Sequence, residues 1–478
     1  MALLRHSGIY FLARIVAGAA GFAIIAAYTR LLSAQEFGEL ALALTGVGFF
    51  ALLILEGPTL AMLRYLPSHP VAARATVLWG LIVPACAICS VAIVAFLLLA
   101  PRLWHVQLAL STGLLLATLP HRFQLAIMQG TLKPGQYALL VGLESILDMA
   151  IGVSLVIAGL GVAGALIGTT VAAMTAMTVN WRGWWVHWKS FDRVLGRQML
   201  RFGLPLALSA LFIWLATFGD RWLVAAFIGA DKAGLYAAAY DLQMNLLGVP
   251  LMVMMLAGYP LTVSAMTERG TEAARTQLRL LGAFVILIVL PEATGIVLTG
   301  PLLVNIFLGP EFRPLSLSLL PILVSATFLK VLLIYVNYGY FLGSRTNLTL
   351  LSMGTAAAID ILLNLVLIPP YGPWGAAVAA VLGFGAGFAI AVIKMGRVFP
   401  FPLPDPAILA GGLIGVAVMV AWLLPFYHIT AWSAVFYVVP VAVVLYFGAV
   451  FLFLYLNGRN PRELLRSLWS ERGPRAPL

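Results

Sequence analysis

Long apolar stretches follow one another along almost the whole chain and are separated by short polar breaks. They recur from Ser7 to Leu456, and each is about 20 residues or longer, the length that an α-helix needs to cross the hydrocarbon core of a bilayer. The stretches are too long and too continuous for the strands of a membrane barrel, which alternate over about ten residues. Helices also pair every backbone group within their own segment. The pattern therefore predicts an all-α polytopic membrane protein.

Placing one span of about 20 residues in each apolar stretch predicts about fourteen transmembrane helices. The expected spans are residues 8–30, 37–63, 75–100, 107–129, 136–159, 161–181, 204–229, 234–265, 279–308, 316–343, 347–369, 372–395, 406–426 and 431–456.

The longest polar break divides the predicted helices into two sets. We expect a six-helix N-terminal lobe over 1–181, a cytoplasmic amphipathic linker over 182–203 and a six-helix C-terminal lobe over 204–396. Two extra transmembrane helices over 397–457 and a cytoplasmic basic tail over 458–478 complete the expected organisation.

The linker has a helical pattern of its own. Arg193, Arg197 and Arg201 recur at every fourth position, whereas Leu195 and Met199 fall on another face. A basic face opposite an apolar one is typical of a helix in the membrane interface. The pattern predicts a helix that lies along the inner leaflet.

Two stretches resemble each other across the middle of the chain. They read SILDMAIGVSLVIAGLGVAGALIG from Ser145 and AAIDILLNLVLIPPYGPWGAAVAAVLG from Ala357. Each contains an aspartate within a helix, Asp148 or Asp360, and then a glycine-rich turn. Because the repeat unit holds an even number of helices, both copies have the same orientation, which predicts a parallel pseudo-repeat of two lobes with a site between them.

Charge is scarce and is distributed unevenly. Only 9% of the residues are charged and 62% are hydrophobic, whereas about a quarter of the residues in soluble domains are charged. The loops opposite the termini contain only Arg30, Arg102, Lys232 and Arg313 of the 28 Lys and Arg. By the positive-inside rule both termini are cytoplasmic. This bias and attraction to anionic lipid account for the net charge of +11, so we expect no nucleic-acid partner.

The sequence lacks the motifs of several enzyme classes. It has no G-x-x-x-x-G-K-[ST] phosphate loop and no H-E-x-x-H zinc motif, and we find no candidate for covalent catalysis. We therefore expect a protein that is not an enzyme, with no catalytic residues, no cofactor and no metal site.

Basic residues within the predicted spans are the candidates for substrate binding. A charged group at the centre of a membrane helix costs roughly 2.5–3.5 kcal/mol, so it must face a cavity or a partner. The candidates are Arg14, Arg122, Arg221 and Lys330. A guanidinium holds phosphate oxygens in a bidentate manner, so these residues would hold a diphosphate and its sugar in a cavity, or they pair structurally with acidic residues. Arg14 and Arg122 lie toward the cytoplasmic ends of their helices and can also snorkel, so the sequence favours the deeper Arg221 and Lys330.

Acidic residues within the spans are the candidates for ion coupling. Glu144 and Asp148 lie one helical turn apart, where two ionised carboxylates repel each other, so either one is protonated or a cation bridges them. Asp220, Asp241 and Asp360 are further candidates. The alternative role for these side chains is hydrogen bonding between helices.

Several segments resemble the bacterial polysaccharide-transporter family of oligosaccharide flippases. The segments are FLARIVAGAAGFAIIAAYTRLLSAQEFGELALA near the start, FGLPLALSALFIWLATFGDRWLVAAFIGADKAGLYAAAYDL from Phe202 and LNLVLIPPYGPWGAAVAA from Leu363. That family belongs to one superfamily with the multidrug and toxin extrusion antiporters and the lipid II flippases.

The resemblance implies transport of a lipid-linked oligosaccharide, usually bound to undecaprenyl diphosphate, across the bacterial cytoplasmic (inner) membrane by alternating access. It also implies polysaccharide polymerase and assembly proteins as partners. A cation-coupled multidrug antiporter and a lipid II flippase remain alternatives, the second because it shares the two extra helices. A membrane-bound glycosyltransferase or polymerase is a third.

Overall fold

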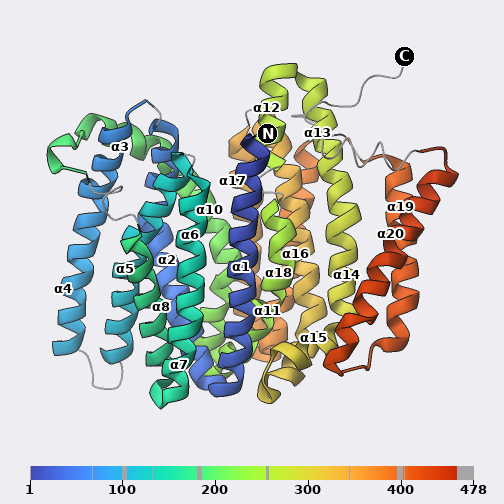
Figure 1. Ribbon diagram of the computed structural model, residues 1–478, viewed down its shortest axis with the longest axis horizontal. Helices are drawn as coiled ribbons and strands as arrows, with labels where there is room; N and C mark the ends of the chain where they lie inside the picture. Colours follow the sequence, from blue (N-terminus) through green and yellow to red (C-terminus); the bar gives the residue numbers. More distant parts are fainter. Residues whose placement is uncertain are drawn as a thin grey trace. The chain divides into compact units, whose positions relative to one another are not determined.

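The computed structural model describes residues 2–66, 68–99, 105–131, 133–179, 186–253, 258–343, 345–395, 402 and 404–459, without the side chains of residues 2–14 and of a few residues in the later helices. Regular structure in these residues is entirely helical (Figure 1). The chain divides into two compact units, Met1–Ala238 and Ala239–Leu478. Most of the predicted basic tail and residues 182–185 of the predicted linker lie outside the described residues.

Unit 1 consists of membrane-length helices and shorter segments continuous with them. They are α1 (Ala2–Leu31), α2 (Ala34–Tyr65), α3 (Pro70–Val77), η1 (Leu78–Ile82), α4 (Val83–Leu99), α5 (His105–Gly130), α6 (Pro134–Leu147), η2 (Asp148–Gly152), α7 (Val153–Leu155), η3 (Val156–Leu160), α8 (Gly161–Thr178), η4 (Trp188–Ser190), α10 (Arg193–Ile228) and the start of α11 (Ala230–Val253). Here η1, η2 and η3 are π-helical and η4 is a 3₁₀ turn.

Unit 2 contains the rest of α11 and the helices that follow it. They are α12 (Tyr259–Arg269), α13 (Thr271–Phe284), η6 (Val285–Val289), α14 (Leu290–Leu298), α15 (Gly300–Phe307), η7 (Pro310–Phe312), α16 (Arg313–Leu342), α17 (Thr346–Tyr371), α18 (Pro373–Met395), α19 (Pro406–Leu423), η8 (Leu424–Phe426), η9 (Trp432–Phe436) and α20 (Val438–Leu456).

Ten helical segments in the described residues are long and apolar enough to cross a membrane, and Ile15–Leu31 is a shorter apolar one. One of the ten, Pro134–Thr178, contains the span expected at 136–159 and all but the end of the span expected at 161–181. The helices also cover the positions of the other expected spans. The prediction of an all-α polytopic membrane protein is confirmed.

The two resembling stretches turn in the same backbone conformation. Gly161 has φ 52° and ψ −133°, and Gly372 has φ 59° and ψ −135°. A positive φ of this kind favours glycine, because a side chain would clash with the backbone. Gly164 and Gly375 follow at the same interval and pack directly on the preceding helix. The internal similarity therefore extends from sequence to local geometry.

Helix α10 differs from the sequence-based expectation. It begins at Arg193 after the Asp192 cap and continues to Ile228, so the basic stretch is continuous with the span expected at 204–229. The basic stretch is therefore not a separate helix, because Pro205 lies within α10 without ending it. The division between the compact units falls at Ala238, whereas the sequence places the linker at 182–203.

Helices α2 and α10 pack against each other along their length. At one end Gly57 approaches Gly203 so closely that a Cβ atom on Gly57 would lie 2.9 Å from the Gly203 carbonyl oxygen. Further along, the ring of Phe49 lies 5.2 Å from that of Trp214. At the end where α11 begins, Gly38 contacts the backbone of Gly234. Small residues at such crossings let helix backbones approach closely and gain dispersion energy.

A larger side chain at the contact between Gly57 and Gly203 should destabilise unit 1. We expect Gly203→Val to lower the free energy of unfolding by about 1–3 kcal/mol, the usual cost of overpacking. Thermal unfolding of the purified protein in detergent measures the effect. Gly142→Val is the matched control, since no atom lies within 4 Å of its Cβ position. Equal midpoints for both variants would contradict this account of the contact.

Candidate functional site

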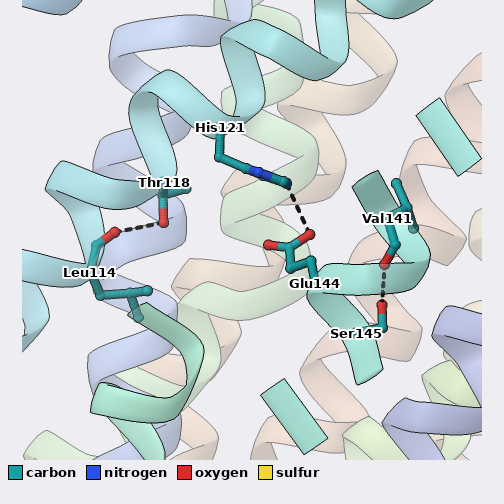
Figure 2. Close-up of polar contacts among 6 residues, drawn as sticks. All are labelled: Leu114, Thr118, His121, Val141, Glu144 and Ser145. Carbon is teal, nitrogen blue, oxygen red and sulfur yellow. Dashed lines mark hydrogen bonds and ion pairs between the residues drawn. The ribbon is translucent and has the colours of Figure 1, made fainter. Parts of the chain in front are cut away.

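A group of polar side chains lies among the first helices of unit 1. His121 on α5 is 2% exposed, and its Nε2 lies 3.0 Å from Oε2 of Glu144 on α6. Figure 2 shows the imidazole and the carboxylate pointing toward each other from the two helices. Thr118 and Ser145 beside them bond the carbonyl oxygens of their own helices. The contact between His121 and Glu144 therefore joins α5 to α6.

Arg122 follows His121 but has a different environment. It is exposed, whereas His121 and Phe123 on either side are buried. Its charge interacts with those of Glu56 on α2 and Glu144 on α6. The Arg122 side chain is therefore exposed while its charge interacts with two carboxylates, one of which also contacts His121.

Asp148 lies one turn beyond Glu144 and has separate partners. Its Oδ1 accepts a hydrogen bond of 2.8 Å from the Thr169 hydroxyl on α8. The hydroxyl of Tyr28 on α1 contacts Gly152, the last residue of η2, and interacts electrostatically with Asp148. Asp148 opens this π-helical segment, a feature often found at functional sites. Three helices thus supply polar groups around this carboxylate.

The carboxylates of Glu144 and Asp148 therefore have different partners. Glu144 contacts His121, whereas Asp148 accepts a hydrogen bond from Thr169. Among the residues that the structure describes, no group of three or more His, Cys, Asp or Glu is placed to hold a metal ion.

Asp220 and Arg221 form a compact buried group on α10. Asp220 Oδ2 accepts a short hydrogen bond from the Tyr236 hydroxyl, and Asp220 Oδ1 accepts one of 2.8 Å from the Arg221 backbone N–H. The Arg221 guanidinium carbon lies 5.2 Å from the Phe218 ring centroid, and the side chain is 5% exposed. This enclosure favours a structural role over contact with a large substrate.

The other residues that the sequence proposes for substrate binding or ion coupling lie in unit 2, except Arg14. Lys330 on α16 is 3% exposed, and its Nζ lies 3.8 Å from Met244 Sδ and 5.6 Å from the Phe384 ring centroid. Asp241 precedes Met244 by one turn of α11, and Asp360 is buried on α17, where it packs on Gly383 of α18. Arg14 lies on α1, and its side chain is outside the described residues.

The pattern of the sequence does not single out His121, Tyr28 or Thr169. A histidine within an apolar span is itself a signal of function, and His121 directly precedes Arg122. Tyrosine and threonine are common in membrane helices, so only their contacts with the group around Asp148 distinguish Tyr28 and Thr169.

The solved structures that the chain resembles are membrane transporters. A lipid II flippase, MurJ, in an inward closed conformation matches with a TM-score of 0.68 and 14% identity over 94% of this chain and 99% of that one. A MATE family multidrug transporter in an outward-facing conformation matches with a TM-score of 0.58 and 17% identity over 83% of this chain and 96% of that one. At these identities the likeness establishes the fold.

A third match is a transporter from Pyrococcus furiosus, which belongs to the MOP superfamily, as the MATE transporter does. It is described as having a binding pocket of reversed polarity. Its TM-score is 0.59 and its identity 18%, over 83% of this chain and 96% of that one. No curated protein sequence matches the chain.

A family model provides the evidence from sequence. The model described as polysaccharide biosynthesis protein matches residues 27–317, more than half of the chain. The chain therefore belongs to the polysaccharide biosynthesis protein family, and its fold is that of the MOP-superfamily flippases and transporters.

Proposed function

We propose that the protein flips a lipid-linked oligosaccharide across the bacterial cytoplasmic membrane by alternating access, with the sugar carried on undecaprenyl diphosphate. The family and the fold support this substrate class over a soluble one. In this proposal both termini are cytoplasmic, the protein performs no chemical step, and polysaccharide polymerase and assembly proteins are its partners.

The observation that carries the proposal is the accessibility of Arg122. A guanidinium within an apolar helix is costly unless it faces a cavity or a partner, and this side chain is exposed between buried neighbours. Its five donors match the oxygens of a diphosphate. Arg122 is therefore the residue that we assign to the diphosphate, ahead of the enclosed Arg221 and Lys330.

Glu56 and Glu144 explain how Arg122 can release its ligand. In the absence of substrate, both carboxylates interact with the guanidinium, so an incoming diphosphate must compete with them. Such competition keeps binding reversible. A transporter needs this property, because a substrate that is held too tightly in one state is not released in the other.

Replacing Arg122 should impair export. We expect Arg122→Ala to reduce it about 10- to 100-fold, because hydrogen bonds to charged groups contribute about 1.5–3 kcal/mol. Arg122→Lys should restore part of the activity, since lysine keeps the charge and loses the bidentate fork. The measurement is the amount of labelled lipid-linked oligosaccharide on each leaflet in a strain that lacks the gene and expresses each variant.

Arg345→Ala is the control for this experiment, because Arg345 is an exposed arginine at the start of α17. Normal distribution of the oligosaccharide in the Arg122→Ala strain would show that Arg122 does not bind the substrate. Normal distribution in the strain without the gene would overturn the proposed function itself.

We also propose that Asp148 and Glu144 couple transport to a cation gradient. Asp148→Asn removes the charge and keeps the shape, so transport should fall and the remainder should no longer respond when the proton or sodium gradient is dissipated. Leaflet distribution with and without an ionophore measures both effects. Asp405→Asn, at an ion pair with Arg459, is the control. Unchanged ionophore sensitivity in Asp148→Asn would exclude Asp148 from coupling.

A cation-coupled multidrug antiporter is the second candidate, because the hydrogen-bonded carboxylate of Asp148 also suits the exchange of cations. The two functions respond differently to one variant. Arg122→Ala should impair the transport of an anionic lipid, as above, and spare the efflux of a cationic dye. In the strain without the gene, loss of dye efflux together with normal surface polysaccharide would favour the antiporter.

A further inference from the structure

A cavity of about 280 Å³ lies in unit 1 where α10 begins. Pro58 of α2, Leu81 of η1, and Met199 and Leu200 of α10 give it an apolar lining. Arg193 and Arg197 are the charged residues of its wall. The cavity therefore combines an apolar interior with two positive charges at one side.

The segment before α10 is fixed to α3 and η1, so the cavity has a defined wall. The Trp79 indole N–H donates a hydrogen bond of 2.7 Å to the carbonyl of Val186. The backbone N–H of Asp192 donates one of 3.2 Å to the Thr76 hydroxyl. The ring of Phe191 packs on Gly80, where a Cβ atom would lie 2.9 Å from it. These contacts hold the first turn of α10 beside the cavity.

Both arginines are exposed, and neither side chain forms an ion pair or a hydrogen bond with the described part of the chain. The N-terminus of α10 is already capped, because Asp192 Oδ1 accepts hydrogen bonds from Val194 N–H at 2.8 Å and from Leu195 N–H at 3.0 Å. The side chains, and not the free end of the helix, are therefore the groups that a ligand would meet.

The exposed stripe of α10 indicates the depth of the cavity in the membrane. Arg193, Arg197 and Arg201 are exposed on this stripe, and it continues with Leu204 and Leu208. A change from arginine to leucine along one exposed helix face marks the passage from lipid headgroups to acyl chains. Trp188, which is 60% exposed just before α10, is typical of the same headgroup layer.

We infer that this cavity binds an anionic glycerophospholipid of the leaflet in which α10 begins, with its phosphate on Arg193 and Arg197 and part of an acyl chain in the apolar cavity. Charge complementarity supports this occupant, since a zwitterionic lipid has no net attraction to two arginines. The apolar wall beside the arginines supports a lipid over a soluble phosphate, which would leave that wall uncovered.

The lipid would have a structural role. The cavity is formed by α2, η1 and α10 together with Phe191, so a bound lipid adds contacts to the same elements that the Gly57 and Gly203 contact joins. A ligand that binds the folded state raises its apparent stability. We therefore expect the anionic lipid to stabilise unit 1, independently of whether the proposed transport function is correct.

Lipid binding to the purified full-length protein tests this inference. The probes are dioleoylphosphatidylglycerol and dioleoylphosphatidylcholine, added in detergent and followed by native mass spectrometry and by thermal unfolding. We expect R193A/R197A to bind phosphatidylglycerol about thirtyfold more weakly, because each basic residue near a membrane surface contributes about 1 kcal/mol. Leu200→Trp should also weaken binding, because it fills the cavity and leaves both arginines in place.

The control is R269A/R279A, which removes two exposed arginines of unit 2 that do not line the cavity. Equal loss of phosphatidylglycerol binding in the control would show a general charge effect and overturn the inference. Retained binding in R193A/R197A would overturn it as well. Binding of undecaprenyl diphosphate but not of phosphatidylglycerol would assign the cavity to the substrate instead.

Discussion

Hydrocarbon offers no hydrogen bonds, so each ionisable side chain within a membrane helix must find a partner or water inside the protein. This constraint explains the contacts of three acidic side chains in unit 1. Glu144 contacts His121, Asp148 accepts from Thr169, and Asp220 accepts from Tyr236. Each contact joins two helices, so the residues that are costly in lipid also hold the helices together.

The packing of α2 on α10 imposes a second constraint. Glycine at positions 57 and 203 lets the two backbones touch, and the aromatic rings of Phe49 and Trp214 fill the space further along. This packing places α10 in the first compact unit, although the sequence assigns it to the second lobe. A polar break in the sequence shows where the chain leaves the membrane, whereas side-chain packing decides which helices form one unit.

The sequence predicts the helices far better than their contacts. Apolar stretches of membrane length locate the spans, and the glycine turns at Gly161 and Gly372 reproduce one conformation in two places. The continuity of α10 could not be read in the same way, because Pro205 and a change from polar to apolar residues suggest a boundary. The hydrogen bond between Asp148 and Thr169 joins residues 21 positions apart, so only the folded helices reveal it.

Burial reverses the order in which the sequence ranks the candidate arginines. Arg221 is enclosed beside Phe218, and Asp220 next to it is already bonded by Tyr236 and by the Arg221 backbone. Arg122 is exposed and interacts with two carboxylates, so its charge can be neutralised by an anion without unfolding a helix contact. An enclosed charge contributes to the architecture, because moving it disrupts packing. An accessible charge with competing partners is suited to binding and release, which is the property that transport of an anionic lipid requires.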